Sequence, residues 1–252
     1  IGMVNMGNQY ADDPQMQQKI REKAMESLKY LVSLVNDVLD MNKLQSGDLK
    51  DHQLLFDLTT VLRELNQIYD EQAAKKGIQY EIDWKNGTYS HIALVGNPVY
   101  LGRILSNILD NAIKFSQAGS VITVGGKEEA LDDGRAFFTF YCKDQGVGMS
   151  EDFIAHAFDM FSQESKTSRS SYEGTGLGLA ITKQLVDRMG GAIELKSEVG
   201  VGTTVVVKIP FKIGTQDKIS NSPDNPVILE DYSVEGMRAL VAEDNELNME
   251  IA

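Results

Sequence analysis

The first long segment of the chain, residues 15–46, has apolar positions spaced by three and four, which is the pattern of an amphipathic helix. This apolar stripe comprises Met25, Leu28, Leu31, Val32, Val35, Val38 and Leu39. Residues 1–6 resemble the end of an earlier helix and residues 7–14 a turn, so the segment predicts a helical hairpin. Because one hairpin does not cover so wide a stripe, two interpretations stand: a four-helix bundle formed by a homodimer, or packing within one chain.

Beyond Gly47 the pattern changes to short strands alternating with helices. Strands are predicted at 54–57, 78–84, 120–129, 136–143, 192–197 and 203–210, and helices at 58–75, 98–115 and 177–189. Turn residues at 132–134 and 198–202 predict two antiparallel hairpins. The mixture indicates an α+β fold. Residues 213–236 are polar, with Ser-Pro and Asn-Pro pairs, and are interpreted as a linker.

Composition narrows the function classes. A formal charge of -13 argues against nucleic acid as a general partner, since phosphate backbones attract clustered Lys and Arg. No run of 18 apolar residues occurs, so we expect no membrane contact by this segment. The single cysteine, Cys142, lies in an apolar run and predicts a buried thiol, which favours the reducing cytoplasm.

The predicted helix 98–115 has one apolar face and one polar face. Asn107, Asn111 and Lys114 are spaced by four and then three residues, so they project from the same side. Asparagine is a mediocre helix former whose amide needs partners when it is covered. This face is either a solvated surface or a binding surface.

Two glycine-rich segments flank other predicted elements. Asp144-Gln145-Gly146-Val147-Gly148 follows a strand, where the carboxylate can accept a hydrogen bond from an exocyclic amine and the glycines let backbone approach a flat base. Gly174-Thr175-Gly176-Leu177-Gly178-Leu179 opens a helix, whose exposed N–H groups and positive end suit a phosphate. Either segment alone is also compatible with an ordinary turn.

Together these segments resemble the sensor histidine kinases. Residues 107–115, 144–148, 158–161 and 174–179 are similar to the N, G1, F and G2 boxes of that family, in the family's order. The resemblance covers 48–212 and implies the Bergerat ATP-binding fold, a helix layer on a mixed sheet, with ATP and Mg²⁺ as cofactors.

The resemblance also assigns roles to single residues. It implies that Asp144 binds the adenine amino group, with Thr203 near the base and Gly146 and Gly148 in the same loop. It implies that Asn111 binds Mg²⁺, with Asn107 alongside and Lys114 near the phosphates. It implies that the phosphates are lined by Gly174, Thr175, Gly176, Leu177, Gly178 and Leu179. Residues 162–173 resemble a mobile lid, in which Lys166 or Arg169 reaches the phosphates or is merely solvated; Phe158 and Phe161 either anchor that lid or belong to the core.

One position separates kinases from hydrolases in the wider superfamily. The resemblance places Asn107 where the hydrolysing members have a glutamate that acts as general base. An amide does not accept a proton from water as a carboxylate does, so we expect slow hydrolysis and transfer to another nucleophile. An ATPase that dimerises around ATP, and a module that uses ATP only to set conformation, are the alternatives.

The two ends of the chain extend the resemblance. Residues 1–47 are similar to the end of the first helix and the second helix of a dimerisation and histidine-phosphotransfer hairpin; the phosphoacceptor histidine is expected upstream of Ile1, because His52, His91 and His156 lack its sequence context. Residues 237–252 resemble the start of a receiver domain, with Glu243 and Asp244 as its acidic pair. The prediction is a segment of a hybrid kinase, divided at 1–47, 48–212, 213–236 and 237–252, and both a membrane-bound and a cytoplasmic parent protein stay open. It would move the γ-phosphoryl group of ATP to a histidine, then to a receiver in cis or a response regulator in trans.

Overall fold

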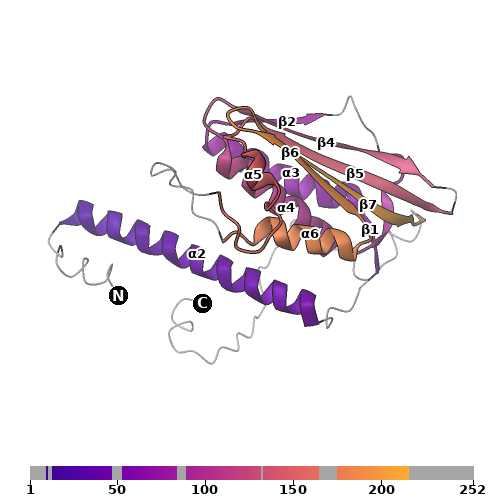
Figure 1. Cartoon of the computed structure of the whole chain (residues 1–252), viewed down its shortest axis with the longest axis horizontal. Coiled ribbons are helices and arrows are strands. Elements are labelled where there is room, and N and C mark those ends of the chain that lie inside the picture. The colour runs from indigo at the N-terminus through magenta and orange to yellow at the C-terminus, as the bar shows by residue number, and fades with distance from the viewer. Residues whose placement is uncertain are drawn as a thin grey trace, which may run out of the picture.

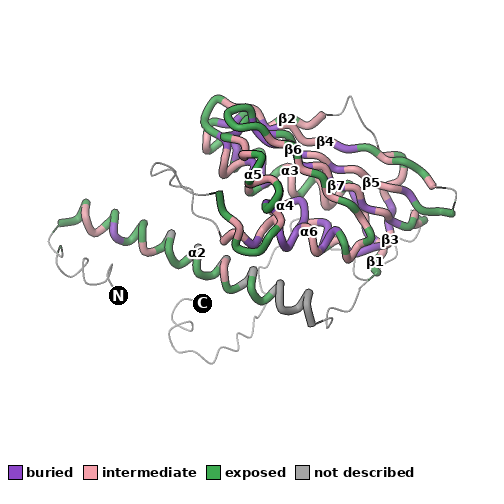
Figure 2. Tube along the Cα trace, viewed as in Figure 1, coloured by how far each residue is buried: buried purple, intermediate pink, exposed green. Residues whose placement is uncertain are grey.

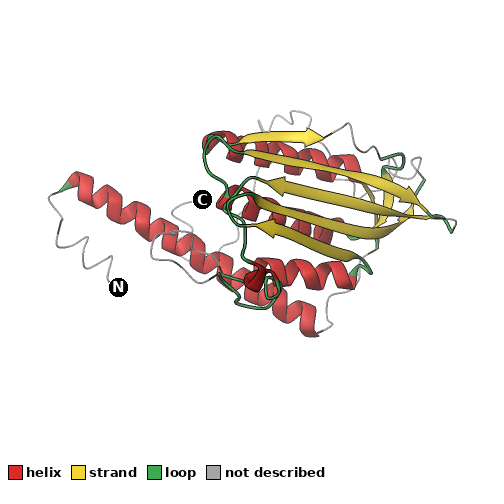
Figure 3. Ribbon diagram, turned by 45° about the horizontal axis from the view of Figure 1, so that its top comes forward, coloured by secondary structure: helices red, strands yellow, loops and turns green. Residues whose placement is uncertain are grey.

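The computed structural model describes residues 10, 13–46, 53–83, 89–131, 133–164 and 175–215. Within these residues a long helix, α2 (Pro14–Ser46), precedes a domain of two layers (Figure 1). One layer is a seven-stranded sheet and the other is a set of helices packed on one of its faces (Figure 3). This architecture confirms the predicted α+β sandwich.

The sheet combines antiparallel hairpins with one parallel pairing. Its strands are β1 (Leu54–Asp57), β2 (Gln79–Asp83), β3 (Ala93–Gly96), β4 (Val121–Ala130), β5 (Arg135–Asp144), β6 (Ala192–Glu198) and β7 (Gly202–Ile213). They are ordered β1-β3-β7-β5-β4-β2, and β6 also pairs with β7. The pairs β4 with β5 and β6 with β7 are antiparallel, as predicted, whereas β2 and β4 are parallel. The sheet is therefore mixed.

The alternation of side chains along β5 decides which residues reach the helix layer. Ala136, Phe138, Phe140 and Cys142 are all buried, whereas the residues between them are not. Because successive strand residues point to opposite faces, Asp144 continues the buried series at the end of the strand. Its carboxyl group therefore faces the helices rather than the open side of the sheet.

Three helices cover that face of the sheet. They are α3 (Leu58–Lys75), α4 (Pro98–Phe115) and α6 (Gly178–Arg188). Side chains cap the first two: Asp57 accepts a hydrogen bond from the N–H of Thr59, and Asn97 accepts one from that of Tyr100. The apolar face of α4, including Leu101, Ile104 and Ile108, is buried in the core. Its opposite face is left for polar residues.

Helix α2 lies beside the domain and contacts α6 (Figure 1). All seven residues of its predicted apolar stripe are between 36% and 59% exposed. Figure 2 shows the same contrast, with α2 mostly exposed and the domain interior buried. The earlier helix predicted at 1–6 lies outside the described residues, so the hairpin itself stays a prediction. The stripe is uncovered by the described part of the chain.

Two elements differ from the sequence prediction. Strand β3 was not predicted, because four residues ending at Gly96 carry too little pattern, yet the strand pairs with β1 and with the end of β7. That pairing extends β7 to Ile213, beyond the predicted limit of 210. A single-turn helix, α5 (Glu151–Ile154), was also missed; Ser150 caps it by accepting a hydrogen bond from the N–H of Phe153.

Candidate nucleotide-binding site

The polar face of α4 is turned toward α6. The Asn107 side chain donates hydrogen bonds from Nδ2 to the carbonyl oxygen of Gly178 at 3.2 Å and to Oγ1 of Thr182 at 3.3 Å. The Thr182 hydroxyl is fully buried and donates in turn to the same carbonyl at 2.8 Å. Because both amide protons point at α6, the Asn107 oxygen is left as the acceptor atom of this side chain. Asn107 thus links the two helices that carry the predicted Mg²⁺ and phosphate ligands.

Asn111 and Lys114 follow Asn107 on the same face of α4. Among the residues that the structure describes, the Asn111 amide makes no hydrogen bond. The Lys114 ammonium lies 4.8 Å from the centroid of the Phe115 ring, at the end of the helix. A side-chain oxygen of Asn111 on this face has the hard-ligand character that Mg²⁺ prefers. These residues fit the predicted metal site.

Asp144 lies at the end of β5, where its carboxyl group is 8% exposed. Its Oδ1 atom accepts hydrogen bonds from the N–H of Gly146 at 2.8 Å and from the N–H of Thr203 at 3.1 Å. Burial raises the pKa of Asp144 above its usual value, although these two hydrogen bonds act in the opposite direction. Since both backbone bonds go to Oδ1, the second oxygen remains available to an amine.

The glycines of the loop after Asp144 are required by its geometry. Gly148 has a φ of +69°, and a Cβ there would collide with the carbonyl of Glu198. A Cβ on Gly146 would lie 2.7 Å from the carbonyl oxygen of Phe115. The N–H of Val147 donates to that same carbonyl at 3.2 Å, which fixes the loop to the end of α4. The G1 loop therefore closes against both α4 and the turn between β6 and β7.

That turn contributes a small hydroxyl network beside Asp144. The Ser197 Oγ atom accepts a hydrogen bond from the N–H of Met149 at 2.9 Å and lies 2.8 Å from Oγ1 of Thr203. Thr203 is buried, as expected for a residue near a base. Ser197 was not predicted, because a serine inside an alternating strand gives no sequence signal of its own. Thr182 was also missed, because a threonine inside a helix gives no sequence signal of its own.

The G2 segment leads into α6 without a capping side chain. Leu177 precedes the helix and makes no side-chain cap, so N–H groups of the first turn are not covered by a cap. A Cβ built on Gly178 would meet no atom within 4 Å, which leaves open space at the helix start. Thr175 accepts a hydrogen bond from the N–H of Leu177 at 3.2 Å and shapes the turn. Leu177 is buried, whereas Leu179 is half-buried.

The F and G2 boxes meet through the backbone. The N–H of Phe161 donates to the carbonyl of Gly176 at 3.0 Å. Phe161 has a φ of +60°, which is unusual for a residue with a side chain, and it is 65% exposed. It is therefore not a core residue, and its role as an anchor of the lid stays a prediction. Phe158 is half-buried. Gly174, Lys166 and Arg169 lie outside the described residues.

The described structure thus brings the four boxes to one side of the helix layer. Hydrogen bonds join Asn107 to Gly178, Phe161 to Gly176, and Val147 to Phe115. The arrangement offers a buried carboxylate for an amine, an uncapped helix N-terminus for phosphates, and amides on the intervening face. An anionic ligand with a flat heterocycle suits these groups.

The comparisons with known proteins agree with this geometry. Residues 96–213 match the family described as "Histidine kinase-, DNA gyrase B-, and HSP90-like ATPase". A full-length ShkA crystal structure in complex with AMPPNP matches with a TM-score of 0.59 and 30% identity, over 79% of this chain and 40% of that one. The Acinetobacter baumannii histidine kinase AdeS matches with a TM-score of 0.61 at 18% identity, which shows the fold alone. Fold and site together define an ATP-binding domain of this ATPase class.

Curated relatives show which group within this ATPase class the chain resembles. The autoinducer 2 sensor kinase/phosphatase LuxQ of Vibrio harveyi is 29% identical over 94% of this chain, and hybrid signal transduction histidine kinase B of Dictyostelium discoideum is 33% identical over 73% of it. The chain spans 27% of the first relative and 9% of the second. The chain contains the ATP-binding catalytic domain of the sensor histidine kinases. Its described helices do not combine the length and apolar content that a membrane crossing requires.

Proposed function

We propose that this domain holds Mg²⁺ and ATP between α4, the G1 loop and the start of α6, and supplies the γ-phosphoryl group to a histidine on a dimerisation hairpin. The observation that carries the proposal is the pair of hydrogen bonds from Asn107 to α6. They place the Asn111 face of α4 against the uncapped helix end, so a metal ligand and phosphate donors share one space.

Each residue has a defined task in this proposal. Asp144 accepts a hydrogen bond from the adenine amino group through the oxygen that its backbone contacts leave available. Asn111 holds the metal ion, and Asn107 keeps α4 and α6 in register. The uncapped N–H groups at Gly178 bind the phosphates. When bound, Mg²⁺ neutralises charge on the β- and γ-phosphates. Lys114, Gly174 of the G2 box and residues of the lid complete the phosphate site.

The absence of a carboxylate at position 107 favours transfer over hydrolysis. Nδ2 of Asn107 is engaged by α6, and the remaining amide oxygen is a poor proton acceptor for water. Catalysis then consists of positioning and charge neutralisation, as phosphoryl transfer requires. The nucleophile is the histidine on the dimerisation hairpin. Slow steady-state hydrolysis without an acceptor is the expected behaviour, and brisk hydrolysis would favour the ATPase alternative.

The exposed stripe on α2 supports the dimer part of the proposal. Its residues 25, 28, 32, 35 and 39 alternate in steps of three and four, which is the seam of a helical bundle. A homodimer buries this seam, and a downstream receiver in cis or a regulator in trans accepts the phosphoryl group. Substituting Val35 by glutamate should convert a dimer to a monomer in light scattering while leaving ATP affinity unchanged.

Two measurements test the catalytic proposal. Titration calorimetry should show Mg²⁺-dependent ATP binding that Asn111→Leu weakens, while Asn66→Leu, a matched change on the neighbouring helix α3, does not. Incubation with γ-labelled ATP and a hairpin carrying the phosphoacceptor histidine should give acid-labile label on that hairpin. Nucleotide binding with no transfer to any hairpin would instead support a conformational module.

A further inference from the structure

The domain contains a cavity whose lining includes none of the nucleotide-site residues Asn107, Asn111, Asp144 and Gly178. This cavity of about 280 Å³ lies between α3, α4 and the strands β2, β4 and β5. The α4 residues that line it are Leu105, Ile108 and Leu109. At 3.6 residues per turn, Leu105 and Leu109 project away from Asn107 and Asn111, and Ile108 lies at the edge between the two faces, so the helix stands between the two spaces.

The cavity lining is mostly apolar and contains two hydrogen-bonded polar pairs, Tyr80 with Asn66 and Tyr141 with Asp83. Leu62, Leu65, Ile82 and Val124 line it and stay only half-buried, so neighbouring side chains do not fill the space. Asn66 and Tyr80 also line it, and the Tyr80 hydroxyl donates to Oδ1 of Asn66 at 2.8 Å. The tyrosine oxygen still has a lone pair that can accept a hydrogen bond. Convergent apolar walls with a few polar groups are typical of a small-molecule site.

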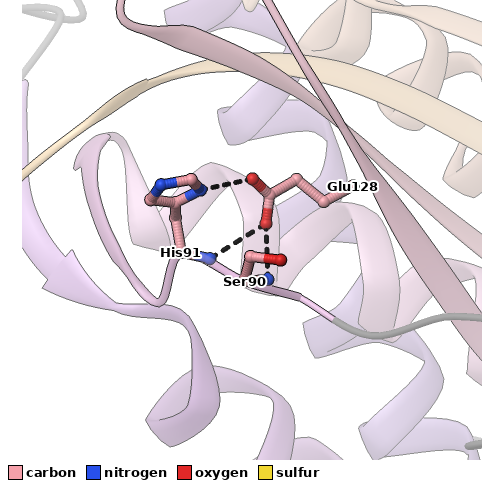
Figure 4. A network of polar contacts seen from close by, with 3 residues as sticks. All are labelled: Ser90, His91 and Glu128. Atoms are coloured by element: carbon pink, nitrogen blue, oxygen red, sulfur yellow. Dashed lines mark hydrogen bonds and ion pairs between the residues drawn. The ribbon is translucent and has the colours of Figure 1, made fainter.

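A described segment, Tyr89 to Ile92, forms one wall of the cavity and is held firmly in place. Glu128 on β4 accepts hydrogen bonds from the N–H groups of Ser90 and His91 at 2.7 and 2.9 Å, and its other oxygen lies 2.5 Å from Nδ1 of His91 (Figure 4). On the inner side, the ring of Tyr89 stacks on Phe138 with centroids 5.6 Å apart. Hydrogen bonds on one side and ring stacking on the other therefore fix this wall of the cavity.

Size and charge define what the cavity can hold. An apolar cavity of about 150 Å³ accommodates benzene, so a space of about 280 Å³ suits two fused rings. Of the described lining residues, Asp83 alone carries a charge, and it is negative. An anionic ligand would meet that charge and lose its hydration, whereas an uncharged one would not.

We infer that this cavity binds an uncharged two-ring aromatic molecule that carries one hydrogen-bond donor, with the donor directed at the hydroxyl oxygen of Tyr80. The site is separate from the nucleotide site, and the two are joined by α4 and by the ends of β5 and β7. Cys142 and Val205 line the cavity, and each lies two residues from a nucleotide-site residue, Asp144 or Thr203. Ligand and ATP bind at the same time.

The inference is tested on the chain as it stands with 2-naphthol as the probe and 2-naphthoate as the charged control. Calorimetry should show 2-naphthol binding with a dissociation constant below about 1 mM, in the range expected for so small a ligand. Saturating ATP should leave that binding in place, and 2-naphthoate should give none. No binding up to 1 mM, displacement by ATP, or equal binding of the carboxylate would each overturn the inference.

The single cysteine locates the binding. Cys142 lines the cavity, so methyl methanethiolsulfonate, a small uncharged thiol reagent, reports access to it by intact mass. At 2-naphthol concentrations about ten times the dissociation constant, labelling should slow about tenfold, because only the unoccupied form reacts. Unchanged labelling under saturation would place the ligand elsewhere and refute the inference.

Cavity-filling variants complete the test. Val124→Phe places a larger side chain in the cavity from strand β4 and should abolish 2-naphthol binding. Val206→Phe, the same change at a half-buried position on the other face of the sheet, should leave the binding intact. Leu62→Trp fills the space from α3 and serves if Val124→Phe does not fold. Retained ATP binding shows that each variant is folded. Ligand binding that persists in the folded filling variants would overturn the inference, while failure of ATP binding in the unaltered chain bears only on the proposed function.

Discussion

Replacing Asp144 by asparagine separates the two roles of its carboxyl group, which are to hold the loop backbone and to bind the adenine amine. One oxygen accepts hydrogen bonds from the N–H groups of Gly146 and Thr203, and the other faces the expected adenine amine. Asparagine keeps one acceptor oxygen, which will turn toward the two N–H donors. Its NH₂ group then replaces the second oxygen and opposes the amine donor-to-donor. The variant should keep the loop and lose the base contact.

The magnitude follows from the bonds involved. A hydrogen bond to a charged acceptor contributes about 1.5–3 kcal/mol, so Asp144→Asn should raise the dissociation constant for ATP by about 10- to 150-fold. Asp144→Ala removes both backbone contacts as well, and each buried N–H without a partner costs about 1–3 kcal/mol. Alanine should therefore destabilise the domain and asparagine should not.

The pH dependence gives the sign of the stability change. Burial raises the pKa of Asp144 in the folded state, so the folded protein holds its proton more tightly than the unfolded chain. The stabilisation from this group is complete below the unfolded pKa and is lost as the pH rises through the folded one. At pH 7 the buried ionised carboxylate thus lowers the free energy of unfolding, and the Asp144→Asn variant should unfold at an equal or higher denaturant concentration.

The assay compares ATP with inosine triphosphate, whose base has an oxygen in place of the amine. The unaltered protein should prefer ATP, and Asp144→Asn should remove or reverse this preference, because its NH₂ can donate to the inosine oxygen. Calorimetry gives both affinities and urea unfolding gives the stability. The assignment of Asp144 is wrong if the preference is unchanged, or if asparagine destabilises the domain as much as alanine does.

Three further outcomes are expected. Lys76→Met removes an ammonium that donates to the carbonyls of Ile113 and Lys114 at 2.6 and 2.9 Å. Amide hydrogen exchange should therefore accelerate in the last turn of α4, and ATP affinity should fall severalfold. The control is Lys75→Met, a change at the exposed neighbouring residue. Glu128→Gln should lower the free energy of unfolding at pH 7 by about 1–3 kcal/mol. Although burial acts to raise the Glu128 pKa, hydrogen bonds from His91 and Ser90 lower it overall. The difference in free energy of unfolding between the variant and the unaltered protein should therefore shrink as the pH falls through that lowered pKa. A difference that stays constant with pH in urea titrations would argue against the contact. Gly148→Ala should cost about 1–3 kcal/mol of stability, because its φ is +69°, and should abolish ATP binding, whereas Gly134→Ala in the β4–β5 turn should leave binding intact.

The sequence predicted most of the elements that position the site. Helix α4 was predicted with its exact limits, because Pro98 marks its start and its apolar face has a clear helical period. Strand β3 and helix α5, each of four residues, were missed, whereas the equally short strand β1 was predicted. Their existence depends on partners far along the chain, which a local pattern does not contain.

For the site, residue types were predictable but their contacts were not. The spacing of Asn107, Asn111 and Lys114 indicated a shared face, yet nothing local indicated that Asn107 bonds to Gly178, 71 residues away. Ser197 and the carbonyl of Phe115 shape the G1 loop without any motif. The cavity behind α4 was equally invisible, since an unfilled volume is a property of packing and not of any one segment.

The links between the boxes explain how distant relatives can share this site. Two of them use backbone atoms at both ends, Val147 to Phe115 and Phe161 to Gly176, and a third backbone bond joins Gly200 of the β6–β7 turn to Val147. Backbone contacts depend on loop path and on glycine positions, not on the identity of most side chains. Relatives with identities of 29–33% can therefore keep the geometry while most side chains change. By the same reasoning, the side chains that do make links, Asn107 and Asp144, are those whose replacement should disturb nucleotide binding most.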